Sequence, residues 1–313
     1  MLSSSSHAAL AVALLTAALG AANPAHLPRS DHPAPIEVSV PTPFAPQVAR
    51  DAQELRDFWT PERMREAVAR SGEGDPEPIG TTSDASVPSA NATAVSVARQ
   101  EPAVSHIGRV FYTLNGNGYA CSANVVESSN RSTVATAAHC MTADGNFSRD
   151  AVFVPGYEDG DAPHGEWPVV GGEIAGGYTQ DNTDLADDTG FLVVAHDDDG
   201  ADIQSVVGAS PVAFNQSLVQ EGSVFGYPAE GRFDGQSLQE CSGVFQEYGP
   251  QQIDLPCDMN GGVSGGPIFA GDSSDGTQYA NEDARYYDSS HVLGPIWQDN
   301  EEAAYAAAAQ ASS

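Results

Sequence analysis

The chain has no lysine. All 12 of its basic residues are arginines, against 43 aspartates and glutamates, so its formal net charge is −31. A surface this acidic repels nucleic acid and anionic membranes, whereas it attracts cationic peptides and divalent ions. The composition therefore argues against a nucleic-acid partner. It agrees with an acidic soluble protein, including one suited to high salt.

Long apolar segments are also missing, apart from residues 8–19 near the N-terminus. That run is shorter than the ~20 residues that a bilayer-spanning helix needs. Small residues follow it at Gly20, Ala21 and Ala22, as they do in secretory signal peptides, although the usual basic start is absent. We expect residues 1–22 to be a signal peptide, so that the mature protein is extracellular and has no membrane contact.

Cysteine is scarce, with four residues, and none lies in a Cys-x-x-Cys motif. The histidines are scattered, so no zinc site or other cofactor is expected. The spacing suggests two local disulfides, Cys121–Cys140 and Cys241–Cys257, although four cysteines allow three pairings. Each loop is short enough for a disulfide to contribute roughly 2–4 kcal/mol, in agreement with an oxidising compartment.

Helical periodicity is nearly absent after residue 106. Short β-branched and aromatic runs, such as residues 109–112, 151–154 and 191–194, alternate with Asn, Gly, Asp and Pro. This pattern predicts an all-β sandwich or barrel. The exception is the tail, where acidic residues followed by alanines favour a helix at about 300–310.

Residues 23–104 are rich in Pro, Ala, Ser and Thr and predict a largely irregular pro-region or linker. One short helix is expected near 61–70, with Thr60 as its cap, Pro61 at its first position and Trp59 packed on Met64. Two interpretations stay open. The helix belongs either to an inhibitory or chaperoning segment that docks on the catalytic domain, or to a spacer.

Two segments contain the candidate catalytic residues, a histidine in one and a serine flanked by glycines in the other. The sequence TAAHC at residues 136–140 contains His139, and GGVSGGP at 261–267 contains Ser264. A serine hydroxyl becomes a nucleophile when an imidazole takes its proton, and a carboxylate must hold that imidazole in the right tautomer. The order of His139 first and Ser264 last, with an acidic cluster between them, predicts a serine hydrolase.

The chain resembles the chymotrypsin/trypsin family of serine peptidases, and in particular its secreted bacterial and fungal branch, which includes glutamyl endopeptidases. The segments that carry the resemblance are CSANVV at 121–126, TAAHC at 136–140, FVPGY at 153–157, FGYP at 225–228 and CDMNGG at 257–262. It extends from about Ile107 to the C-terminal helix. It implies a peptidase domain at residues 105–313 with two antiparallel six-stranded barrels, at about 105–200 and 201–298. It also implies a zymogen, with His139 as the base, Ser264 as the nucleophile, and the amides of Gly262 and Ser264 as the oxyanion hole.

Four aspartates are candidates for the orienting acid. They are Asp181, Asp184, Asp187 and Asp188. Asp188 fits best because it directly precedes the apolar strand 191–194, as the family's aspartate does. Asp184 is the alternative.

Two further positions bear on activation and specificity. Val263 stands where trypsin-like zymogens carry the aspartate that pairs with a new N-terminus, so that activation switch is not expected. By resemblance Asp258 is a candidate for selecting basic substrate residues, and His291 for selecting glutamate. The sequence does not decide between them.

Two other functions compete with that of a serine endopeptidase. An esterase with Asp288 and His291 as triad partners leaves only 49 residues after Ser264, too few for an α/β-hydrolase fold. A catalytically inactive, protease-like binding protein is the second, although all three triad roles have candidates here. We therefore expect a monomeric secreted serine endopeptidase that acts on peptides or proteins and needs no cofactor.

Overall fold

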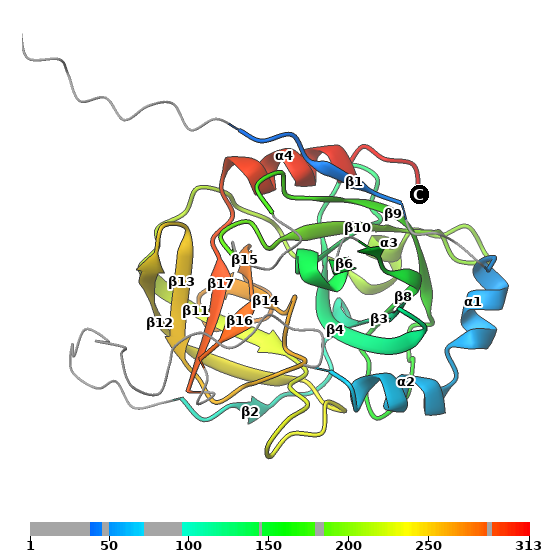
Figure 1. Ribbon diagram of the computed structural model, residues 1–313, viewed down its shortest axis with the longest axis horizontal. Coiled ribbons are helices and arrows are strands. Elements are labelled where there is room, and N and C mark those ends of the chain that lie inside the picture. The colour runs from blue at the N-terminus through cyan, green and yellow to red at the C-terminus, as the bar shows by residue number, and fades with distance from the viewer. Residues whose placement is uncertain (1–37, 46–49, 72–95, 144–145, 179–184, 287–289) are drawn as a thin grey trace, which may run out of the picture. The chain divides into compact units, whose positions relative to one another are not determined.

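The first sheet closes into a six-stranded barrel. The computed structural model describes residues 38–45, 50–71, 96–143, 146–178, 185–286 and 290–313 (Figure 1). The barrel strands, in spatial order, are β8 (Arg149–Pro155), β3 (Ile107–Leu114), β4 (Asn117–Val126), β5 (Thr133–Thr136), β10 (Gly190–Val194) and β9 (Trp167–Ile174). Pairing of β9 with β8 completes the ring, and a short strand β1 (Thr42–Phe44) adds to β9.

Local sequence explains how this barrel begins. Asn115 and Gly116 both have positive φ, at 50° and 85°, between the paired ends of β3 and β4. An Asn-Gly pair in this conformation is a two-residue turn whose twist matches that of the flanking strands. The turn therefore sets the register that places Cys121 of β4 opposite Val110 of β3.

The second sheet is an open half-barrel. Its strands, in spatial order, are β15 (Gln278–Asn281), β14 (Pro267–Ala270), β11 (Gln220–Gly226), β12 (Gln239–Gly249), β13 (Gln252–Pro256), β17 (His291–Pro295) and β16 (Ala284–Arg285). A short β2 (Arg99–Gln100) adds to β12. An isolated bridge joins Ala280 of β15 to Ile296, the residue just after β17. The expected all-β, chymotrypsin-like fold is confirmed, with the difference that only the first barrel is closed by a ladder.

Helices are few and short among the described residues. They are α1 (Ala52–Phe58), α2 (Pro61–Val68), α3 (Ile203–Val207) and α4 (Asp299–Ala308), with a 3-10 turn η1 (Ala138–Cys140) and a small hairpin of β6 (Thr142–Ala143) and β7 (Asn146–Phe147). The expected C-terminal helix is confirmed as α4, which packs against β9 and β10 (Figure 1). The Thr60 hydroxyl accepts from the Arg63 amide at the start of α2. None of the helices in the described ranges is long and apolar enough to cross a bilayer.

Residues before the barrels take part in the cores. Phe44 lies in the apolar core of the first barrel, and Leu55, Trp59 and Met64 share a second core with Phe111 on the barrel's outer face. The sequence left this packing open, since both a docked segment and a spacer were possible for the short helix of the 23–104 segment. The expected signal peptide, residues 1–22, lies outside the described residues.

The two sheets are connected through Ser122 of β4. Its amide donates to the carbonyl of Ser264 at 2.8 Å, and its hydroxyl donates to the carbonyl of Gly262 at 3.0 Å. The Tyr227 amide, just after β11, donates to the same hydroxyl at 3.0 Å. A side chain of the first barrel therefore fixes the glycine-rich loop of the second sheet.

Candidate active site

His139 lies on η1, directly after β5, and a disulfide holds this turn. Cys140 is bonded to Cys121 of β4, and a second disulfide joins Cys241 and Cys257. The structure thus contains both disulfides that the spacing suggested. Because Cys140 is the next residue, the bridge restricts the backbone from which the His139 imidazole projects.

Asp188 contacts His139 through both carboxylate oxygens. Its Oδ2 lies 2.8 Å from His139 Nδ1, and its Oδ1 accepts the His139 backbone amide at 2.9 Å. Both side chains are fully buried. A carboxylate in this position accepts the Nδ1 proton and leaves Nε2 as the basic nitrogen, which is the tautomer a general base requires.

Asn281, at the end of β15, holds the backbone on which Asp188 lies. Its Nδ2 donates to the Asp188 carbonyl at 3.0 Å, while its Oδ1 accepts from Thr189 Oγ1 at 2.7 Å and from Trp297 Nε1 at 2.9 Å. All these groups are buried. Asn281 is not among the site residues expected from the sequence, because an isolated asparagine on a short strand carries no signal of long-range pairing.

The Ser264 loop packs directly against the histidine segment. Gly265 has φ of +82°, and a Cβ at this position would overlap Thr136 Oγ1 and lie 2.9 Å from the amide nitrogen of Ala137. Only glycine tolerates both the conformation and the close approach. The turn therefore brings the loop that carries Ser264 against the segment that leads into His139.

Gly262 and Val263 complete this loop. Gly262 has φ of +97°, and Val263 is buried in the core of the second sheet. Val263 is therefore a packing residue, and it offers no carboxylate for an N-terminal ion pair. Gly262 and Ser264, whose amides the resemblance implies as the oxyanion hole, both lie in this loop.

The two candidate specificity residues have separate partners. The Asp258 carboxylate accepts from Arg232 Nε at 2.8 Å, from Arg232 Nη2 at 3.1 Å and from the Ala98 amide at 2.7 Å. His291 Nδ1 lies 2.6 Å from Asp254 Oδ2, and its ring stacks on Tyr286 at 4.5 Å.

Of the other aspartate candidates, only Asp187 lies within the described residues. Asp187 accepts from Asn300 Nδ2 at 2.8 Å, on the side of α4. Asp181 and Asp184 lie outside the described residues, as does Asp288 of the rival esterase triad.

A third carboxyl, Asp283, is buried near Asp188. Gln252 Nε2 donates to its Oδ2 at 3.1 Å. Burial raises the pKa of Asp283 well above its ordinary value, and the Asp188 charge adds to the rise. Two carboxylates that share a dry environment cannot both ionise easily, so this environment favours the protonated form of Asp283.

Among the residues that the structure describes, two clusters have the residue types of metal ligands, and both contain a disulfide. They are Cys121, His139 and Cys140, and Cys241, Cys257 and Asp258. Metal binding by cysteine requires the thiolate. The bonded sulfurs of these clusters are therefore not available as ligands.

Solved structures include close relatives of this chain. Protease Anisep from Arthrobacter nicotinovorans is 38% identical, with a TM-score of 0.65, and the match covers 68% of this chain and 100% of that one. The thermostable serine protease AL20 from an extremophilic microorganism is 36% identical, with a TM-score of 0.63, covering 67% and 100%.

A Glu endopeptidase is 17% identical, with a TM-score of 0.53, and the match covers 66% of this chain and 93% of that one. At this level of identity it shows a shared fold alone. No protein-family model matches the chain, and no curated protein does.

Proposed function

The chain belongs to the chymotrypsin/trypsin-like serine peptidases, and we propose that His139, Asp188 and Ser264 form its catalytic triad. It is a serine endopeptidase, which acts on peptide or protein substrates. The observation that carries the triad is the pair of contacts from the Asp188 carboxylate to the Nδ1 and backbone amide of His139. The packing of Gly265 against residues 136 and 137 supports the nucleophile.

In the proposed first step, Ser264 Oγ attacks the carbonyl carbon of the scissile peptide bond. His139 Nε2 takes the hydroxyl proton as the Oγ–C bond forms, and Asp188 stabilises the resulting imidazolium. The amides of Gly262 and Ser264 stabilise the oxyanion, and losing one such donor typically costs on the order of 10²–10³ in rate. His139 then returns the proton to the leaving amine as the C–N bond breaks.

In the second step, water replaces the amine. His139 removes a proton from the water as its oxygen attacks the acyl-enzyme carbonyl, and the ester bond to Ser264 breaks. The proton returns to Ser264 Oγ and the carboxylic acid product leaves.

We further propose that the enzyme is made with a signal peptide, exported and monomeric. The apolar run at residues 8–19 and the two disulfides support export, because disulfides persist in oxidising compartments.

Replacement of each triad residue in the exported enzyme tests the proposal. Ser264→Ala should abolish peptide hydrolysis and labelling by a fluorophosphonate serine probe while leaving secretion intact. Asp188→Asn should lower kcat by about 10⁴, because the imidazole then adopts the wrong tautomer. Asp184→Asn is the matched control and should keep wild-type kcat.

The contrary outcomes are separable. Full activity in Ser264→Ala would rule out this nucleophile, and a large loss in Asp184→Asn alone would transfer the acid role. A wild-type enzyme that neither hydrolyses peptides nor labels would be the inactive binding protein considered above.

A further inference from the structure

Ser122 of β4 has hydrogen bonds to both ends of the short segment that contains the proposed nucleophile. Its amide donates to the Ser264 carbonyl at 2.8 Å, and its hydroxyl donates to the Gly262 carbonyl at 3.0 Å. Ser122 is fully buried. A residue of the first barrel therefore restrains residues 262–264 at their first and last carbonyls.

The Ser122 hydroxyl has its direction set by its neighbours. The Tyr227 amide lies 3.0 Å from it, and because a backbone amide can only donate, the hydroxyl oxygen accepts there. Its one proton is left for the Gly262 carbonyl. Tyr227 is itself held, since the buried guanidinium of Arg109 donates to the Tyr227 carbonyl at 3.2 Å.

The loop has little rigidity of its own at this point. Gly262 follows Gly261, and its φ is +97°. Glycine is conformationally permissive, so its peptide groups rotate easily unless a neighbour restrains them. A Cβ at Gly262 would lie 2.9 Å from the Tyr227 carbonyl oxygen, so a side chain that would stiffen the loop does not fit. The restraint on the direction of these peptide groups has to come from outside the loop.

The carbonyl of Ser122 faces the histidine segment. Thr136 Oγ1 donates to this carbonyl at 2.9 Å, and Thr136 begins the segment that leads to His139. A Cβ on Gly265 would overlap both the Ser122 carbonyl and Thr136 Oγ1. Ser122 thus contacts the histidine segment and the nucleophile loop at the same time.

We propose that Ser122 is a positioning residue for the oxyanion hole, whose hydroxyl fixes the Gly262 carbonyl so that the amides of Gly262 and Ser264 stay directed at one oxyanion. The proposal rests on the triad and the oxyanion hole proposed above. An oxyanion hole is effective because its donors are oriented before the charge develops. Loss of the hydroxyl would leave the Gly262 carbonyl and the Tyr227 amide buried without this partner, and rotation of the loop would then relieve the cost.

Ser122→Ala in the exported enzyme tests this role. We expect kcat on a peptide ester to fall by ~10–100-fold with KM little changed, because a shift of about 1 Å at a catalytic group can cost 10²-fold in rate. A peptide boronate forms a tetrahedral adduct with Ser264 that places an oxygen at the oxyanion hole, so its affinity should fall by a similar factor. The pH at which kcat/KM rises should stay that of wild type, because the contacts between Asp188 and His139 are unchanged.

Ser223→Ala is the matched control for the loss of a buried hydroxyl. Ser223 is also a fully buried serine, on β11 of the second sheet. The same substitution there should leave kcat and the boronate affinity unchanged.

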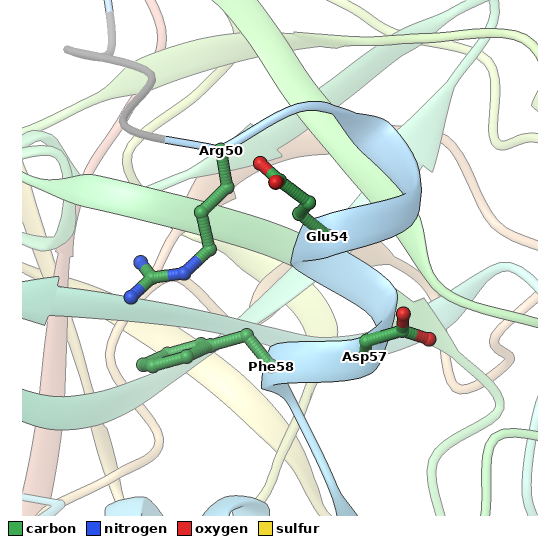
Figure 2. A pocket seen from close by; sticks show the side chains of 4 residues that line it. All are labelled: Arg50, Glu54, Asp57 and Phe58. Atoms are coloured by element: carbon green, nitrogen blue, oxygen red, sulfur yellow. The ribbon is translucent and has the colours of Figure 1, made fainter.

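A second control separates lost stability from lost positioning. Figure 2 shows a pocket on α1 that is lined by Arg50, Glu54, Asp57 and Phe58. The guanidinium groups of Arg50 and Arg63 lie 4.0 and 4.2 Å from the centroid of the Phe58 ring. Phe58→Ala removes both contacts and should lower stability, as measured by urea denaturation, while kcat stays that of wild type.

An isosteric pair of variants decides the role if Ser122→Ala does not fold. Ser122→Thr keeps the hydroxyl, whereas Ser122→Val has the same shape without it. The kcat of the threonine variant should exceed that of the valine variant by ~10-fold or more, again because the valine variant lets the loop shift.

The outcomes separate the two proposals. Wild-type kcat in Ser122→Ala, equal kcat in the threonine and valine variants, or an effect confined to KM or to stability would overturn the positioning role alone. Full activity in Ser264→Ala would mean that the triad proposal fails instead.

Discussion

Asn281, at the end of β15 in the second sheet, donates to the backbone carbonyl of Asp188. Asn281→Ala would leave the Asp188 carbonyl, Thr189 Oγ1 and Trp297 Nε1 without this partner. A shift of about 1 Å at a catalytic group can cost 10²-fold in rate, so we expect kcat to fall by ~10–100-fold with KM little changed. Steady-state kinetics on a peptide ester measure this split.

The control for Asn281 is Thr189→Val, which removes only one of these hydrogen bonds. It should lower stability by about 1 kcal/mol while keeping kcat within a few-fold. An Asn281→Ala enzyme that loses stability but keeps wild-type kcat would mean that the residue is structural and does not position the acid.

A variant of Asp258 tests whether this residue determines the cleavage preference. Its carboxylate accepts from Arg232 and from the Ala98 amide, so we expect it to anchor residues near Ala98 and not to bind basic substrate side chains. Asp258→Asn should leave the cleavage preference unchanged, as measured by mass spectrometry of peptides released from a denatured proteome. Loss of an existing preference for Arg or Lys would contradict this expectation.

At the scale of elements, the two disulfides hold different parts of the molecule. Cys121–Cys140 restrains the turn that carries His139, whereas Cys241–Cys257 lies in the core of the second sheet. Replacing either pair with serines should destabilise the protein by roughly 2–5 kcal/mol. Only loss of the first pair should also lower kcat, because it frees the histidine turn.

The variant without Cys241–Cys257 is the matched control for the variant without Cys121–Cys140. The stability of both is measured by urea denaturation, and their kcat at a temperature where each remains folded. An equal fall in kcat for the two would contradict the assignment of a positioning role to the first disulfide.

At the scale of the whole molecule, buried carboxyls make stability depend on pH. Burial raises the pKa of Glu301, on α4, from 4.5 to about 8, and raises the pKa of Glu166 from 4.5 to about 7. The folded state therefore keeps protons that the unfolded chain has already released. The contribution of these two groups to stability is therefore fully present below about pH 4.5 and is lost as the pH rises toward 8.

Glu301→Gln tests this dependence. It should flatten the fall in unfolding free energy by up to about 1.4 kcal/mol per pH unit, the value for one proton. Glu302→Gln, at the exposed neighbouring position, should leave the slope unchanged. Urea denaturation between pH 5 and pH 8.5 measures both, and parallel curves for wild type and Glu301→Gln would contradict the prediction.

The sequence by itself determined the all-β class, the C-terminal helix and the segments that carry His139 and Ser264. Each of these depends on local information: strand-length apolar runs, turn residues, a cysteine next to a histidine, and glycines around a serine. Asp188 was also selected locally, from the strand that follows it. The geometry brings this residue to His139, and its role stays a proposal.

Tertiary structure alone decided the rest. The partnership of Asn281 with Asp188, the pairing of Asp258 with Arg232, the burial of Arg109 against Ser71 and the packing of α1 and α2 on the barrel all join residues distant in sequence. Such contacts form only when the folded sheets pack together. A local sequence pattern therefore does not predict them. A segment rich in proline and serine therefore resembled a pro-region or linker, although Phe44, Leu55, Trp59 and Met64 are buried in the folded protein.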